Sequence, residues 1–302
     1  MKLYPLTMLD FQDMFPTEDA CREYLTLVRW PDGFHCPRCM NTSAWKMGSG
    51  LFRCTNCRHR ASITSGTIFQ DTHKSLQLWF QAAWYIVNQK QGVNALGLQK
   101  ALGLGSYRTA WSWLHKLRQA MVRPGRDKLS GIVEIDETII GGPRPGKAGR
   151  SAEGKILVLI AVEDKGKEGI GRIRMRTIPN ASQVTLKENV QQMVEEGSTV
   201  LTDGWKGYDP LKSAGYTHII VEKTSPSDDS TPLVHRIASL LKRWLLGTHQ
   251  GAVRASHLNY YLDEFTFRFN RRKSRSRGKL FYCLMQQAVS IDPIPVKTLK
   301  VS

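Results

Sequence analysis

The chain has 302 residues, of which 41% are hydrophobic, and this length suffices for two or three folded units with at least one sizeable core. Its formal net charge of +17 favours a polyanionic partner, and nucleic acid is a better expectation than an anionic surface. The longest apolar run, 156–162, is far shorter than the ~20 residues of a membrane-spanning helix, and no secretory segment opens the chain. We therefore expect a cytoplasmic protein without a membrane partner.

Residues 1–30 are predicted to form an N-terminal helical segment. Thr17 is a plausible helix start, and Cys21, Tyr24 and Leu25 fall on the apolar side of the helix that follows. These residues are expected to serve packing.

Residues 31–70 are predicted to form a zinc ribbon. Two C-x-x-C pairs lie 14 residues apart, and each pair can aim two thiolates at one tetrahedral Zn²⁺. The predicted ligands are Cys36, Cys39, Cys54 and Cys57. Free or redox-active thiols are the alternative, but two matched pairs in one small module favour zinc. Four thiolates would leave no open position, so the zinc is expected to be structural.

Residues 74–125 are predicted to form a helical DNA-binding region. Apolar residues recur there with helical spacing, and the stretch 93–111 reads as a helix, a glycine turn and a second helix. This is the outline of a helix-turn-helix.

Residues 130–290 are predicted to form an α/β catalytic domain, followed by a tail over 291–302. The expected strands are 132–140, 155–163, 172–178, 199–203 and 217–222. Ser182 is expected to cap a helix that ends near Glu196, and a polar loop over 224–231 leads into the closing helices. Ribonuclease H-like domains are one fold with this mixed-sheet order.

Two aspartates in this domain are candidate metal ligands. Asp136 lies within a strand of β-branched residues, where a carboxylate needs a cation or hydrogen bonds, and Asp203 ends a later strand. Either residue alone is more typical of a turn or a cap. On two strands of one sheet in a basic protein, the pair predicts a site for Mg²⁺ or Mn²⁺. Strand alternation puts Glu134 on the same face as Asp136 and Glu137 on the other.

The third ligand of such a site is harder to assign. Later acidic residues have other expected roles, in a solvated loop or in ion pairs on a helix: Asp228, Asp229, Asp263 and Glu264. His235 is the remaining candidate because it opens a helix and imidazole can bind manganese or magnesium. Lys242 follows seven residues later on the same face. The alternatives are a capping or packing histidine and a lysine on a solvated basic face.

Basic residues that could contact phosphate crowd into 268–279. The predicted DNA contacts are Arg108, Lys116, Arg243, Arg268, Arg271, Arg272, Lys273, Arg275 and Arg277. A second set alternates along one strand, namely Arg172, Arg174 and Arg176, and is either a DNA-facing stripe or the exposed side of an edge strand.

Over nearly its whole length the chain resembles the zinc-ribbon DDE transposases of bacterial insertion sequences, in the group called the "fifteen-ninety-five" family. The resemblance is carried by CPRC (36–39), CTNC (54–57), VEIDET (133–138), TDGWKGY (202–208), SLLKRWLLGTH (239–249) and HLNYYLDEFTFRFNRR (257–272). The last of these stretches is the most diagnostic.

The resemblance implies a ribonuclease H-like domain in which Asp136 and Asp203 match the first two acids of a triad. The third family position falls at His235, where much of the wider superfamily has glutamate, and the accompanying lysine falls at Lys242. The implied activity is two-metal cleavage and transfer of DNA strands without a covalent protein intermediate. The implied partners are terminal-repeat and target DNA, bound by a homodimer or higher oligomer in a bacterial nucleoid.

Two other functions fit the same residues. The first is a ribonuclease H-like nuclease or resolvase that does not transpose. The second is a zinc-ribbon and helix-turn-helix regulator whose C-terminal half has lost catalysis.

Overall fold

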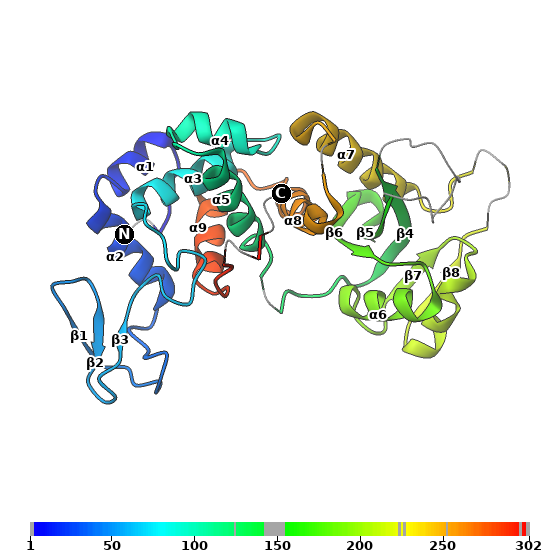
Figure 1. The fold of residues 1–302 in the computed structure, drawn as a ribbon. Helices are drawn as coiled ribbons and strands as arrows, with labels where there is room; N and C mark the ends of the chain where they lie inside the picture. Colours follow the sequence, from blue (N-terminus) through cyan, green and yellow to red (C-terminus); the bar gives the residue numbers. More distant parts are fainter. Residues whose placement is uncertain are drawn as a thin grey trace. The chain divides into compact units, whose positions relative to one another are not determined.

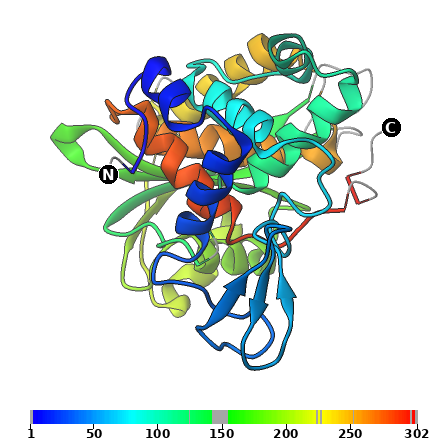
Figure 2. The same ribbon diagram turned by 90° about the vertical axis from the view of Figure 1, so that its left-hand side faces the viewer.

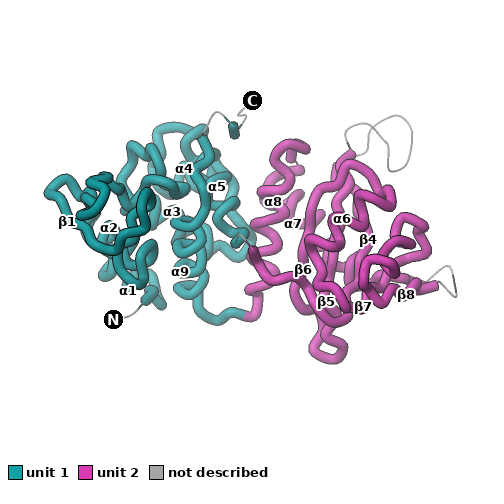
Figure 3. Tube along the Cα trace, turned by 90° about the horizontal axis from the view of Figure 1, so that it is seen from below, with its two compact units in different colours: residues 1–124, 274–302 teal, residues 125–273 magenta. Residues whose placement is uncertain are grey.

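The computed structural model describes residues 3–123, 125–141, 155–222, 225, 228–251, 253–295 and 298–299. It divides into two compact units, unit 1 (Met1–Pro124 and Ser274–Ser302) and unit 2 (Gly125–Lys273) (Figure 3). Parts of four predicted segments lie outside the described residues: 1–2 of the N-terminal segment, 124 of the helix-turn-helix region, 142–154, 223–224, 226–227 and 252 of the catalytic domain, and 296–297 and 300–302 of the tail. Of the helices in the described ranges, none is long and apolar enough to cross a membrane.

Unit 1 is mainly helical. Its described helices are α1 (Met8–Met14), α2 (Glu18–Arg29), α3 (Leu76–Asn88), α4 (Ala95–Leu102), α5 (Tyr107–Gln119) and α9 (Arg277–Ala288). The predicted start at Thr17 is confirmed, because its side chain accepts the Ala20 amide. The predicted helix, glycine turn and helix are also confirmed, with Gly103 left-handed (φ 61°) after α4.

Helix α9 packs within unit 1, although the sequence placed it in the catalytic domain. The Phe281 side chain of α9 is fully buried and meets aromatic rings of the first three helices, namely Phe11, Tyr24 and Phe80. Burial of this aromatic face brings the end of the chain back to its beginning. The structural boundary therefore falls at Lys273 and not at residue 290.

A small antiparallel sheet completes unit 1. Its strands, in the order β1 (Ala44–Lys46), β2 (Phe52–Cys54) and β3 (Arg60–Ala61), are two or three residues long. They form the ribbon seen in blue in Figure 2. Strands this short bury little apolar surface, so the ribbon needs another source of stability.

Unit 2 contains, in its described part, one five-stranded mixed sheet. The strands are β4 (Ile132–Ile140), β5 (Ile156–Asp164), β6 (Ile170–Ile178), β7 (Thr199–Thr202) and β8 (Thr217–Ile220). Their order is β6-β5-β4-β7-β8. The pairs β4–β5 and β5–β6 are antiparallel, and the pairs β4–β7 and β7–β8 are parallel. This order confirms the predicted ribonuclease H-like sheet, with strand bounds within two residues of those expected.

Helices cover both faces of the sheet (Figure 1). One face carries α6 (Gln183–Met193) and the 3-10 helix η2 (Lys206–Ala214), and the other carries α7 (Pro232–His249) and α8 (Ala255–Asn270). Strand β5 is buried on both faces, as its continuous apolar run predicts. A short 3-10 turn, η1 (Gly166–Glu168), joins β5 to β6.

Helix α6 begins as predicted but ends early. The Ser182 side chain accepts the Thr185 amide at the start of the helix. The sequence extends the helix to Glu196, whereas the structure ends it at Met193. Val194 is extended because it forms a parallel bridge to Leu129.

The arginine stripe of β6 is bonded within unit 2. Arg172 pairs with the buried carboxylate of Glu163 at 2.7 Å. Arg174 is itself buried and donates to backbone carbonyls of Arg126 and Asp127. Arg176 donates to the Gln192 side chain. These contacts tie the entry of unit 2 to its sheet, and of the three side chains Arg174 is covered while Arg176 stays exposed.

Asp263 on α8 is expected to make stability depend on pH. Burial raises the pKa of Asp263 to about 7 from its ordinary value of 3.8, although Arg126 and Arg176 act in the opposite direction. Because the folded-state pKa is raised, its stabilising contribution is complete below about pH 4 and is lost as the pH rises towards 7. Asp263→Asn should therefore stabilise the protein by on the order of 2 kcal/mol at pH 8 and by less at pH 5. Thermal unfolding at both pH values measures the difference, and the exposed Asp209→Asn is the control. An equal effect at both pH values would contradict the assignment.

Candidate functional site

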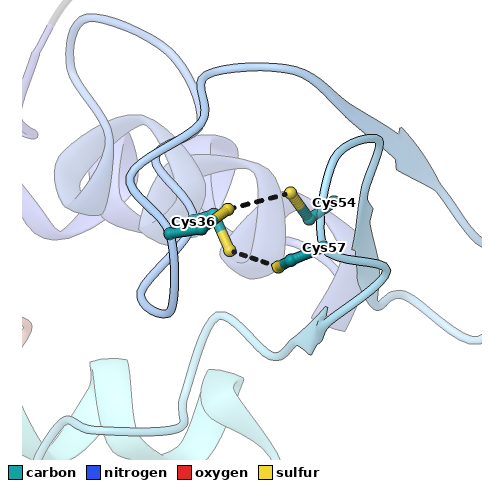
Figure 4. A group of neighbouring side chains, drawn as sticks. Cys36, Cys54 and Cys57 are labelled. Carbon is teal, nitrogen blue, oxygen red and sulfur yellow. Dashed lines mark hydrogen bonds between the residues drawn. The ribbon is translucent and has the colours of Figure 1, made fainter.

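The four cysteines of the ribbon converge on one point. Their Sγ atoms all lie within 4.8 Å of one another, and the Cys36–Cys57 and Cys39–Cys54 pairs are each 3.6 Å apart (Figure 4). A tetrahedral Zn²⁺ with bonds of about 2.3 Å places its sulfur ligands roughly 3.8 Å apart. The cluster therefore has the donor atoms and spacing of a structural zinc site.

The two C-x-x-C turns are built alike. Met40 and Arg58, which follow the second cysteine of each pair, are left-handed (φ 60° and 59°). Their amides donate to the carbonyls of the first cysteines, at 2.9 Å to Cys36 and 3.2 Å to Cys54. In addition, the backbone N–H of Asn41 lowers the pKa of the Cys39 thiol. Both turns thus present their sulfur atoms on the inside, and each contains a cysteine whose thiol pKa is lowered, Cys39 in the first and Cys54 in the second.

Asp136 and Asp203 lie on neighbouring parallel strands of unit 2. In the register of β4 and β7, Glu134 lies opposite Leu201, so two further residues put Asp203 level with Asp136. The Asp136 side chain is buried, while Asp203 is half-buried and accepts the Trp205 amide at 3.1 Å. The sheet therefore brings the two predicted carboxylates side by side, at the point where β7 ends next to the middle of β4.

The start of α7 is bonded to β4 through two carboxylates. Glu134 accepts the Leu233 and Val234 amides at 2.9 and 3.2 Å, so it caps the helix from the sheet. The Thr231 hydroxyl donates to Asp136 at 2.8 Å. The sequence placed Glu134 on the face of Asp136, and here that face receives α7.

His235 lies between two carboxylates. Its Nε2 is 3.3 Å from Oδ2 of Asp136, and its Nδ1 is 2.6 Å from Oδ1 of Asp229. Asp229 also accepts the Thr231 amide at 3.1 Å. The expectation that Asp229 is merely solvated is therefore wrong, because the loop before α7 folds back onto the helix. Asp228 instead accepts the amide and hydroxyl of Ser225.

The buried carboxylates have raised pKa values. Burial is the main cause of the raised pKa of Asp136, and the charge of Asp203 raises it further, against the Thr231 and Glu137 hydrogen bonds. Burial likewise raises the pKa of Glu134. A bound cation would oppose both effects, because it favours the charged form.

The donor atoms of Asp136, Asp203 and His235 lie further apart than the four sulfur atoms of the ribbon. Over the described residues, the four cysteines are the only group of three or more potential ligands whose donor atoms all lie within 4.8 Å of one another. His235 and Lys242 share the exposed side of α7 with Ser239 and Arg243.

Glu137 lies on the opposite face of β4, as strand alternation predicts. It accepts the Tyr208 hydroxyl at 2.6 Å, and the pKa of Tyr208 lies well above its ordinary value, chiefly through burial. Glu137 therefore supports the packing of η2 against the sheet.

The predicted DNA-contact residues fall into two groups. Exposed residues are Arg108, Arg243, Arg272, Lys273 and Arg275. Lys116 is buried, and this burial lowers its pKa, so the expectation of a surface phosphate contact is wrong for this residue.

The other arginines of the group are bonded within their own unit. Arg268 pairs with the buried Glu264 at 2.7 Å, which is the ion pair expected on this helix. The guanidinium group of Arg271 lies over the Phe267 ring. Arg272, although exposed, likewise lies over the Phe269 ring and bonds carbonyls at the start of β6. Arg277 donates to the Val87 carbonyl at 3.5 Å.

Two family models match the chain. The ISXO2-like transposase domain matches residues 128–270, and the transposase zinc-ribbon domain matches residues 16–60. The chain therefore contains a domain of the ISXO2-like transposases and a transposase zinc ribbon. This transposase is also 26% identical over 289 residues to a protein in transposable element ISH50 of Halobacterium salinarum, described as uncharacterized. That match covers 88% of the transposase and 94% of its relative, and it confirms the predicted link to an insertion sequence.

Two solved structures are less similar to the transposase. The catalytic core domain of BIV integrase has a TM-score of 0.30 and 16% identity, covering 49% of the transposase and 86% of the integrase chain. An intasome of simian T-cell lymphotropic virus, in complex with PP2A regulatory subunit B56 gamma, has a TM-score of 0.33 and 14% identity. This match covers 61% of the transposase and 70% of the intasome chain. At such TM-scores, the assignment of the fold rests on the strand order described above.

Proposed function

We propose that this transposase cleaves the ends of its element and joins them to target DNA at a divalent-metal site formed by Asp136, Asp203 and His235. The observation that supports this most strongly is the register of β4 and β7, which sets the two aspartates level on neighbouring strands. His235 contacts the first of them from α7.

The residues fit a hard divalent cation. Two carboxylates and one imidazole are ligands that Mn²⁺ accepts and Mg²⁺ accepts less readily. The Asp136 carboxylate is buried, where its charge needs compensation. When bound, the ions would activate the attacking oxygen and stabilise the leaving oxygen of a phosphodiester.

The chain's own residues position these ligands. Glu134 holds the start of α7 against β4, and Asp229 bonds the Nδ1 side of His235 so that Nε2 faces Asp136. Lys242 is exposed on the same side of α7 and would neutralise a DNA phosphate.

The remaining regions are proposed to bind the element ends. The ribbon with its zinc and the helices α4 and α5 would read the terminal repeats, with Arg108 exposed at the start of α5. Pairing two ends for strand transfer calls for a homodimer or higher oligomer on DNA.

The test is a reaction of the purified chain with duplex ends of the DNA element that encodes it, in Mg²⁺ or Mn²⁺. Cleavage at the end followed by joining to a second duplex supports a transposase. Cleavage without joining would indicate a nuclease or resolvase. Specific binding without cleavage in either metal would indicate a regulator and would overturn the proposal.

Asp229→Asn is expected to weaken both metal binding and activity. Asparagine keeps the shape of the side chain but loses the carboxylate that orients the His235 ring, and loss of such an outer partner typically costs 10–100-fold. The Mn²⁺ affinity, measured by calorimetric titration, and the rate of end cleavage should both fall by roughly tenfold.

Asp228→Asn is the matched control, because Asp228 is the adjacent carboxylate and bonds Ser225 instead of His235. It should keep the Mn²⁺ affinity within about twofold of the wild type. His235→Ala, which removes the proposed ligand, gives the lowest affinity expected in this series. Equal effects of the two asparagine variants would show that the loop, and not the orientation of His235, is responsible.

A further inference from the structure

Trp205 is a large aromatic side chain beside the proposed metal site that the reaction so far leaves without a role. It lies two residues after Asp203, and its own backbone amide donates to that carboxylate. The residue is 44% exposed, whereas Trp79 and Trp113 of unit 1 are buried in a stacked pair. Packing in the core therefore does not account for this tryptophan.

The ring of Trp205 is held in one orientation. Its indole N–H donates to the Ala181 carbonyl at 3.0 Å. A Cβ at Gly207 would overlap the indole nitrogen and lie 2.7 Å from Cδ1 of Leu186, so this glycine leaves room for the ring. A side chain that is already ordered loses little conformational entropy when a ligand stacks on it.

The surroundings of Trp205 suit a nucleotide. Ile220 at the end of β8 pairs in register with Thr202, is 43% exposed, and has its Cγ2 3.9 Å from the position of a Cβ at Gly204. Apolar surface therefore flanks the backbone that joins Asp203 to Trp205. Lys206, the next residue, is exposed, and Gln183 donates to its carbonyl.

We propose that Trp205 and Ile220 form a stacking shelf for an unpaired nucleobase next to the phosphate at Asp203, with Lys206 contacting the backbone of that strand. The proposal rests on the proposed function, because it assigns the shelf to the same DNA strand. Stacking on an aromatic ring tolerates any base, since each base has a π face. The net charge of +17 favours a polyanion over an apolar peptide as the occupant.

The test is a cycle that combines Trp205→Ala with single abasic nucleotides. A set of duplex ends of the encoding element is prepared, and each duplex carries a single abasic nucleotide. The set covers the three positions on either side of the cleavage point. Binding is measured by fluorescence anisotropy in Ca²⁺, and strand joining separately in Mg²⁺. At one position the abasic nucleotide should weaken binding of the wild type by roughly tenfold, and binding of Trp205→Ala hardly at all. Trp205→Phe should recover most of this sensitivity.

Val184→Ala is the control, because it removes a 66% exposed apolar side chain from α6 in the same unit. It should bind like the wild type at every position. The shelf is overturned if no abasic position distinguishes wild type from Trp205→Ala by more than about twofold, even when joining is normal. Coupling in the binding assay without any cleavage or joining would instead retain the shelf and refute the proposed function.

Discussion

Asp203→Asn is expected to abolish end cleavage and strand joining, with a fall of roughly a thousandfold or more in both rates. The carboxylate is replaced by a neutral amide that binds Mg²⁺ and Mn²⁺ poorly. The fold should persist, because the amide oxygen can still accept the Trp205 amide that Asp203 accepts. Rates are measured on labelled end duplexes in each metal, and thermal unfolding confirms that the variant is folded.

Asp209→Asn is the matched control for this loss. Asp209 is an exposed acid on η2, six residues further along the chain and outside the proposed site. It should keep the wild-type rates within about twofold. If Asp203→Asn cut DNA as fast as Asp209→Asn, Asp203 would not be a metal ligand.

The sequence was most informative for features that are determined by residues close together in the chain. The apolar run of β5 predicted a strand buried on both faces, and the cap at Ser182 predicted the start of α6. Alternation along β4 placed Glu134 and Glu137 on the faces where the structure has them. Each of these features depends on neighbours within a few residues.

Features that depend on distant partners could not be predicted in the same way. Asp229 lies in a polar loop, and nothing in its neighbourhood indicates that the loop turns back to place its carboxylate on His235. Helix α9 follows the catalytic domain in the chain, but its Phe281 completes an aromatic core that begins at Phe11. Lys116 belongs to a helix with a basic end, yet its side chain is covered.

The candidate metal site was predicted only in part, for a physical reason. An acid within a strand or directly after one is recognisable because charge is costly there. A histidine at the start of a helix has many possible roles, so His235 depended on the family resemblance. The capping of α7 by Glu134 shows what sequence reasoning missed: a buried acid next to a candidate ligand could have been read as an anchor for the next helix.

Loss of zinc is expected to unfold the ribbon and leave unit 2 folded. The strands β1–β3 have two or three residues each, and modules of this size rarely fold without a metal or disulfides. Structural zinc contributes about 10–16 kcal/mol in zinc-finger peptides, which exceeds what so small a core supplies. Cys54→Ser should therefore lose its zinc, measured as one equivalent per wild-type chain. Amide hydrogen exchange should become fast across residues 31–70 and stay slow in β4 and β5.

Cys283→Ser separates this effect from the general loss of a thiol, because Cys283 is a half-buried cysteine outside the cluster. It should retain zinc and the exchange protection of the ribbon. A chelator added to the wild type should reproduce Cys54→Ser, since both remove the ion that the four sulfur atoms hold. Binding of the element ends should weaken in both cases if the ribbon reads the terminal repeats. Retained zinc in Cys54→Ser, or an ordered ribbon without the ion, would show that aromatic contacts such as Trp30 with Phe52 stabilise this module by themselves.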